Sequence, residues 1–154
     1  MPYLHLDTVT SHPTALKREL ATRLGQIYAD TMQTTPDLVN VTFRELGEGN
    51  IWNCATNPPR PSAVLSCEIR RGRPPERRER LGKALMAALV ETLGFDPTLT
   101  AVEFTQHAGD EIYLEGYVDG RLEGGLGKDW NPNEQAGQSM MDSIVADKRK
   151  EHAL

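Results

Sequence analysis

Two features of the chain could do chemistry: a proline at position two and a cluster of arginines near the middle. Pro2 directly follows Met1, and a residue this small at position two makes Met1 a normal target for an aminopeptidase. Without Met1 the chain would begin with a secondary amine, which can act as a base or a nucleophile when a strand holds it rigidly. Many chains begin Met-Pro by chance, so the dipeptide alone does not decide the function.

The arginine cluster is the segment RRGRPPERRER, which runs from position 70 to position 80 and holds six arginines. Its last three arginines alternate with glutamates on a predicted helix, a pattern typical of a solvated, ion-paired face. Arg70 and Arg73 instead fall in the loop before that helix, and loops of this kind commonly carry binding sites. A guanidinium offers forked donors that match a carboxylate, so these two residues are predicted to bind an acidic substrate.

A proline amine and a pair of arginines can serve one reaction. The amine is a general base only when neutral, so its pKa must lie near or below the working pH. Nearby cations disfavour the protonated amine. If Arg70 and Arg73 lie close to Pro2, they would therefore both hold an acidic substrate and keep the base neutral. Arg71, between them, is expected to point to the opposite face.

The elements that must position these residues form a repeat with an offset of 61 residues and no gap. Each half reads as strand, helix and strand, and a helix-length crossover favours parallel strands. The apolar positions match through all three elements, which favours an internal duplication. The repeat covers residues 2–46 and 63–107, joined by a linker at 47–62 and followed by a C-terminal extension at 108–154. The predicted strands are 2–8, 38–46, 63–69 and 99–106, and the predicted helices are 15–32 and 74–94.

The predicted fold is a single α/β domain over residues 1–154. Two tandem βαβ units would form a four-stranded mixed sheet with two helices on one face. Residues 111–118 are predicted to form a short strand or hairpin arm, and residues 132–152 a terminal helix. A sheet covered on one face only is expected to expose apolar surface, so oligomerisation is expected.

Composition limits the remaining function classes. The net charge of −5 argues against general nucleic-acid binding. No apolar run could span a membrane, and no signal peptide is visible, so a cytoplasmic protein is expected. Cys54 and Cys67 are isolated cysteines, and a disulfide is not expected. His5 and Asp7 share one strand face, but two ligands without a third predict a plain polar pair, so no metal is expected.

The chain combines a duplicated βαβ unit, a proline at its start, and the element Arg70-Arg71-Gly72-Arg73 before the second helix. In these features it resembles the tautomerase superfamily, the 4-oxalocrotonate tautomerase-like proteins. The likeness spans roughly residues 2–135 and is greatest to the fused, two-βαβ group typified by cis-3-chloroacrylic acid dehalogenase. It implies a tautomerase/MIF-like fold, a homotrimer, no cofactor, and a pocket in which Pro2 lies beside the arginines of the second half.

Three positions matter in the comparison with that group. Tyr28 stands where the group has a histidine near the end of the first helix; it could supply a hydroxyl to the pocket or pack in the core. Glu103 stands in place of a tyrosine in the last strand of the second half. Glu115 corresponds to the carboxylate that activates water. The replacement of two partners disfavours dehalogenation, whereas keto–enol tautomerisation needs only a base, a carboxylate clamp and support for the enolate.

The sequence therefore predicts a cofactor-independent tautomerase acting on a small 2-oxo or unsaturated carboxylic acid. Pro2 would be the base, Arg70 and Arg73 the carboxylate binders, and Glu115 an acid–base partner. One alternative is a dehalogenase-like hydratase that adds water to an unsaturated (halo)acid through Glu115. A non-enzyme alternative is a ferredoxin-like module that binds a small ligand, with Pro2 incidental.

Overall fold

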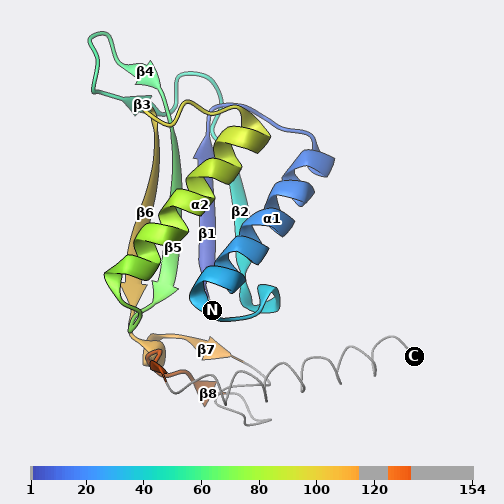
Figure 1. Ribbon diagram of the computed structural model, residues 1–154. Helices are drawn as coiled ribbons and strands as arrows, with labels where there is room; N and C mark the ends of the chain where they lie inside the picture. The colour runs from blue at the N-terminus through green and yellow to red at the C-terminus, as the bar shows by residue number, and fades with distance from the viewer. Residues whose placement is uncertain (1, 115–124, 133–154) are drawn as a thin grey trace. The chain divides into compact units, whose positions relative to one another are not determined.

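The computed structural model of the chain describes residues 2–114 and 125–132, which belong to two compact units (Figure 1). Unit 1 comprises Met1–Ile69 and Pro74–Thr105, and unit 2 comprises Arg70–Arg73 and Gln106–Leu154. No helix in the described ranges is long and apolar enough to cross a membrane.

A four-stranded sheet and two helices make up most of unit 1. The strands lie in the order β2-β1-β5-β6, with β1 parallel to β2 and antiparallel to β5. Figure 1 shows β5 and β6 running in the same direction, and α1 and α2 on one face of the sheet. The predicted mixed α/β sheet is confirmed. The elements are β1 (Tyr3–Thr8), α1 (Thr14–Met32), β2 (Asn40–Glu45), β5 (Ala63–Arg70), α2 (Pro75–Leu93) and β6 (Thr100–His107).

Prolines and left-handed residues set the limits of the two helices. Each helix begins directly after a proline whose extended backbone cannot continue a helix backwards, Pro13 for α1 and Pro74 for α2. Each ends at a residue in the left-handed region, Gln33 with φ 54° and Gly94 with φ 69°. The two helices begin and end 61 positions apart, which is the offset of the sequence repeat.

The core of unit 1 lies between the helices and the sheet face that they cover. Alternate residues of β1 and β5 are fully buried, and they meet leucines at helical spacing on α1 and α2. Burying one such leucine stabilises the fold by about 1.5–3 kcal/mol. Burial also raises the pKa of the Cys67 thiol to about 12, with Glu103 adding to the effect, so this thiol stays neutral. The fully buried residues include Leu4, Leu6, Leu20, Leu24, Leu65, Cys67, Leu81, Leu85 and Leu89.

The opposite face of the sheet is mostly polar in the described residues, which differs from the expectation of an apolar open face. Most of the side chains that alternate with the core residues carry hydroxyl, imidazole, carboxylate or guanidinium groups, and these groups pair across the strands. Val64 and Ala101 are apolar exceptions on this face. The pairs are Tyr3 with Thr42 (2.7 Å), His5 with Glu68 (3.5 Å), Asp7 with Arg44 (2.5 Å) and Ser66 with Glu103 (2.5 Å).

Glu45 ties the end of β2 to the segment that leads into α1. Its carboxylate accepts hydrogen bonds from the backbone N–H of His12 (2.9 Å) and from Ser11 Oγ (2.9 Å), and it lies 3.0 Å from Lys17 Nζ. The bond from His12 is the largest cause that lowers the Glu45 pKa to about 2, followed by the bonds from Lys17 and Ser11. Glu45 is therefore ionised at any ordinary pH and fixes where the first helix begins.

The segments outside the repeat agree with the predictions only in part. The predicted linker at 47–62 contains a short hairpin of β3 (Trp52–Asn53) and β4 (Arg60–Pro61). In unit 2, β7 (Tyr113–Leu114) pairs antiparallel with β8 (Gly125–Leu126), where a strand or hairpin arm was predicted. Residues 115–118 of that predicted strand, and the predicted terminal helix beyond residue 132, lie outside the described residues.

Candidate active site

Pro2 is held at the start of the central strand β1. It is buried, and its carbonyl oxygen accepts a hydrogen bond of 3.1 Å from the backbone N–H of Asn40, the first residue of β2. The strand continues into the core through Leu4 and Leu6, both fully buried. The backbone at Pro2 is thus fixed by the sheet on one side and by core packing on the other, as a rigid catalytic amine requires.

The arginine loop, Arg70–Arg73, connects β5 to the segment before α2 and belongs to unit 2. Gly72 makes the turn with a backbone φ of +120°, a conformation that residues with a side chain rarely adopt. Arg73 is only 6% exposed, and its guanidinium carbon lies 5.3 Å from the ring centre of Trp130. Arg70 is half-buried and donates from Nη1 to the carbonyl oxygen of Lys128 (3.0 Å).

Arg71 has a different environment from Arg73. Its exposed side chain forms an ion pair with Asp129, with Nε 2.6 Å from Oδ2. This bond is the main cause that lowers the pKa of Asp129, and a hydrogen bond from the Gly109 backbone N–H adds to it. The same ion pair raises the pKa of Arg71. Arg71 therefore anchors the loop through a carboxylate of the protein itself, whereas Arg70 and Arg73 stay the predicted substrate-binding arginines.

Tyr28 and Glu103 lie on opposite sides of the sheet of unit 1. Tyr28 is 1% exposed and belongs to the hydrophobic core, as the core-packing alternative predicts. Glu103 is exposed on the polar face and accepts a hydrogen bond from Ser66 (2.5 Å). The structure thus does not bring these two side chains together, and a role for either toward a substrate stays a prediction.

Glu115, the predicted acid–base partner, lies outside the described residues.

The predicted polar pair of His5 and Asp7 lies on the open face of β1, where His5 contacts Glu68 and Asp7 contacts Arg44. Within residues 2–114 and 125–132, no three histidine, cysteine, aspartate or glutamate side chains are grouped as metal ligands would be.

The remaining arginines of the cluster lie on the first turns of α2. Arg77 donates from Nη1 to Gln33 Oε1 (2.8 Å), at the C-terminal end of α1. Glu79 pairs instead with Lys83 one turn later (2.7 Å), which lowers the Glu79 pKa. Arg77 and Arg80 border a polar hollow of about 350 Å³ whose other walls include Asp30, so positive and negative charges share it.

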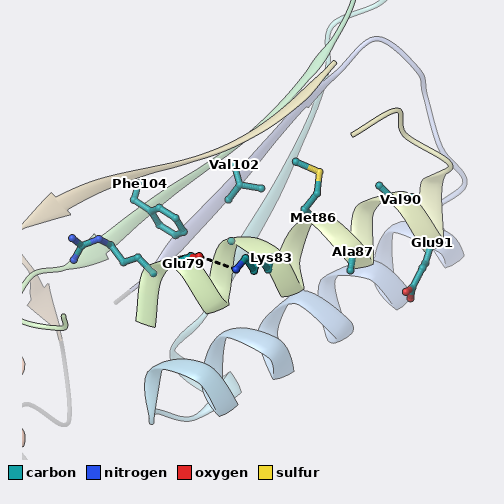
Figure 2. A pocket seen from close by; sticks show the side chains of 10 residues that line it. Glu79, Lys83, Met86, Ala87, Val90, Glu91, Val102 and Phe104 are labelled. Atoms are coloured by element: carbon teal, nitrogen blue, oxygen red, sulfur yellow. Dashed lines mark hydrogen bonds and ion pairs between the residues drawn. The ribbon is translucent and has the colours of Figure 1, made fainter. Parts of the chain in front are cut away.

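Sequence reasoning missed a groove of about 770 Å³ between α2 and β6 in unit 1. Figure 2 shows Val102 and Phe104 of β6 directed toward α2, where Met86 and Val90 complete an apolar floor. Charged side chains lie along the helix beside it, including the paired Glu79 and Lys83. The apolar floor itself carries no ionisable group, and the ionisable residues of the groove, such as Glu79 and Lys83, lie on the helix beside it.

Comparisons with known proteins rest on structure, since no family model and no curated protein sequence matches the chain. A member of the cis-3-chloroacrylic acid dehalogenase family, N1, superimposes with a TM-score of 0.68 at 16% identity, covering 89% of this chain and 98% of N1. Pt0534, in a form inactivated by 2-oxo-3-pentynoate, gives 0.66 at 20% identity, covering 74% and 92%. A fused 4-OT, solved as a symmetric trimer, gives 0.65 at 18% identity, covering 73% and 90%.

The chain has the tautomerase fold. At these identities the likeness establishes the fold and not the reaction, and it confirms the fold resemblance expected from the sequence. The sheet also differs from the ferredoxin-like alternative, because a ferredoxin-like fold has split βαβ units, whereas β1 and β2 are adjacent and parallel here.

One set of contacts had no counterpart in the sequence predictions. Lys128, Asp129 and Trp130 bind the arginine loop, although the sequence separates them from it by more than 50 positions. Gly72 and Gly109 are the available signal, because each lies where a neighbouring backbone comes too close for a side chain.

Proposed function

We propose that the protein is a cofactor-independent enzyme of the tautomerase superfamily that uses the amine of Pro2 on a small 2-oxo or unsaturated carboxylic acid. The observation that carries this proposal is the burial of Pro2 at the head of β1, with its carbonyl held by Asn40. Removal of Met1 would turn this fixed residue into a secondary amine at the end of a core strand. The tautomerase fold supports the same reading.

The proposed reaction converts an enol to a ketone through one proton shuttle. The neutral Pro2 nitrogen accepts the proton of the enol hydroxyl, and the oxygen electrons form the carbonyl. The carbon–carbon double bond shifts its electrons to the next carbon, which takes the proton back from the Pro2 ammonium. Atoms and charge balance without a metal or a cofactor, and the base is regenerated.

Arg70 and Arg73 are proposed to hold the substrate's carboxylate. The near-complete burial of Arg73 supports this role, because a guanidinium removed from water binds an anion more strongly than an exposed one. Forked donors also fix the orientation of a carboxylate, as a point charge such as lysine does not. Their positive charge would in addition disfavour the protonated form of a nearby amine.

The solved neighbours support the substrate class. Pt0534 is inactivated by 2-oxo-3-pentynoate, a 2-oxo acid with a conjugated alkyne. A secondary amine can add to the far alkyne carbon of such a compound, with a proton taken up at the neighbouring carbon. The amine remains attached because the product is an enaminone, in which the nitrogen lone pair is delocalised into the carbonyl. We infer that the present chain takes carboxylic acids of the same kind, with unsaturation next to a 2-oxo or enol group.

A second candidate reaction is the addition of water to an unsaturated or halogenated acid, with Glu115 activating the water. The likeness to N1, of the cis-3-chloroacrylic acid dehalogenase family, favours it, since that match covers 89% of this chain. Tyr28 in the core and Glu103 on the open face of the sheet weigh against it, because they replace residues of that group. Product identification separates the two reactions, because hydration adds one water and tautomerisation adds nothing.

Two measurements test the proposal in sequence. The intact mass of the purified protein first shows whether Met1 is absent, because a retained Met1 acylates Pro2 and excludes it as an amine. Enol-to-keto conversion of an arylenolpyruvate is then followed with the wild type and with Pro2→Ala, which replaces the secondary amine by a primary one. We expect a large loss of kcat/KM in the variant. Equal rates would remove Pro2 from the mechanism.

We also propose that the protein is a homotrimer. Fused 4-OT proteins of the same fold were solved as symmetric and asymmetric trimers. The polar open face of the sheet predicts that contacts across this face are hydrogen bonds and ion pairs rather than apolar packing. Light scattering after size-exclusion chromatography would show three copies; a monomeric mass would contradict the assembly.

A further inference from the structure

A short stretch of unit 2, Lys128–Trp130, is bound to the arginine loop at three consecutive residues. The carbonyl oxygen of Lys128 accepts from Arg70 Nη1 (3.0 Å), and Asp129 forms the ion pair with Arg71 (2.6 Å). The backbone N–H of Trp130 donates to the carbonyl oxygen of Arg71 (3.0 Å). Side-chain and backbone bonds together hold this stretch against the loop, so the backbone that carries the Trp130 ring lies beside it.

Glycines on both sides of the contact allow the backbones to approach this closely. A Cβ added at Gly72 would lie 2.2 Å from the carbonyl oxygen of Trp130, and one added at Gly109 would lie 1.8 Å from the carbonyl carbon of Lys128. Gly109 also donates its N–H to Asp129 Oδ1 (2.8 Å). Any larger residue at either position would push the stretch away, so the close contact depends on glycine at two separate sites.

The ring of Trp130 lies against the most buried arginine of the loop. The guanidinium carbon of Arg73 is 5.3 Å from the ring centre, within the range of a cation–π contact, and Arg73 is 6% exposed. A guanidinium is planar, so a contact with an aromatic face restricts the direction in which its N–H donors point. In water such a contact would be weak, but here the arginine is largely removed from solvent.

We propose that Trp130 is a positioning residue for Arg73: its ring fixes the guanidinium in the orientation that binds the substrate's carboxylate. This inference rests on the proposed function, since it gives Trp130 a role in the same substrate site. The Lys128–Trp130 stretch then belongs to the substrate site through Arg73, although it lies more than 50 positions beyond the arginine loop in sequence. The proposed role of Trp130 is exerted through the arginine and not on a reacting atom.

Two substitutions separate the aromatic face from simple packing. Trp130→Leu keeps apolar bulk and removes the ring, whereas Trp130→Phe keeps a smaller aromatic face. Trp52→Leu is the matched control, because Trp52 is 51% exposed and lies in unit 1. We expect Trp130→Leu to raise KM for an arylenolpyruvate roughly 5- to 30-fold with kcat changed less than about twofold, as loss of a desolvated cation–π contact implies. Trp130→Phe should be intermediate, and Trp52→Leu should match the wild type.

A measurement without substrate distinguishes failure of this inference from failure of the proposed function. In ¹⁵N-arginine NMR spectra, the Arg73 Nε–H resonance, identified by its loss in Arg73→Lys, should be displaced by the ring current of Trp130. Trp130→Leu should return it to the usual arginine region. A displaced resonance in a protein that turns over no substrate would refute the proposed function and leave the contact standing. An undisplaced resonance would overturn the inference even in an active enzyme.

Folding of the variants is checked by thermal unfolding before the kinetics are compared. If Trp130→Leu does not fold, Trp130→Phe decides the question on its own. Its smaller ring should raise KM roughly two- to fivefold and reduce the displacement of the Arg73 resonance, because phenylalanine binds cations more weakly than tryptophan. An unchanged KM and an unchanged resonance in Trp130→Phe would overturn the role of the ring.

Discussion

Replacing Arg73 is the most informative single perturbation of the proposed substrate site. A hydrogen bond to a charged group is worth about 1.5–3 kcal/mol, which corresponds to roughly 10- to 150-fold in binding. Because Arg73 is only 6% exposed, its bond to a carboxylate would form away from bulk water, which favours the upper part of that range. We therefore expect Arg73→Ala to raise KM for an arylenolpyruvate roughly 50- to 150-fold, with a smaller effect on kcat.

The assay needs controls for charge, folding and substrate. Arg73→Lys keeps the charge but loses the forked donors, so it should recover only part of the affinity. Arg60→Ala removes an exposed arginine of β4 and should behave as the wild type. Urea denaturation reports the loss of the Trp130 contact, expected at about 0.5–2 kcal/mol. A neutral ester of the substrate should be insensitive to Arg73. Unchanged KM and kcat in a folded Arg73→Ala protein would refute the reasoning.

Three further predictions concern the fold and the contact with the arginine loop. Glu45→Gln should lower the free energy of unfolding near neutral pH. Because folding lowers the pKa of Glu45 from 4.5 to about 2, the stabilisation by its carboxylate is complete above pH 4.5 and is lost as the pH falls through 2. Urea denaturation of the wild type and the variant at several pH values would show this difference. Iodoacetamide should modify Cys54, which is exposed, and should reach the buried Cys67 only in denaturant; rapid double labelling of the native protein would contradict this burial. Gly109→Ala should lower kcat/KM, because the added Cβ would lie 1.8 Å from the carbonyl carbon of Lys128 and would push the Lys128–Trp130 stretch away from the arginine loop. Gly25→Ala, where nothing lies within 4 Å of the added Cβ, is the control: it should leave activity unchanged and stabilise the protein by up to about 1 kcal/mol.

The sequence predicted the two helices and the sheet because local signals agree there. Apolar residues recur at helical spacing between Pro13 and Gln33, and Pro13 marks the start of the helix. The same pattern recurs 61 positions later. The strands alternate cleanly, as in β5, where every second residue is buried. Such short-range patterns need no knowledge of distant contacts, so they can be read directly from a single chain.

The polar face of the sheet shows where the reasoning failed. Tyr3, His5 and Asp7 alternate with the buried Leu4 and Leu6, so the sequence already indicated a polar outer side for β1. The expectation of an apolar face followed only from the prediction that helices cover one side of the sheet, and it ignored the alternation of polar and apolar residues in β1. The solved trimers of the same fold therefore support oligomerisation more strongly than this face does.

The candidate site could be predicted only as a list of residues. Pro2, Arg70 and Arg73 were chosen for their chemistry and for a resemblance, and neither fixes geometry. The contact of Trp130 with Arg73 depends on a close backbone approach between segments more than 50 positions apart. No periodicity marks such a contact, and glycine at positions 72 and 109 indicates it only once the fold is known.

The measurement that tests the central claim most directly is the site of modification by 2-oxo-3-pentynoate, the compound that inactivates the structural neighbour Pt0534. The account predicts that the protein loses activity, gains the mass of one inhibitor molecule, and carries it on the amino-terminal peptide at Pro2. Excess of a carboxylate substrate should slow the reaction, because Arg70 and Arg73 would already be occupied. An amino-terminal peptide that retains Met1, or an adduct located on another residue, would contradict the account.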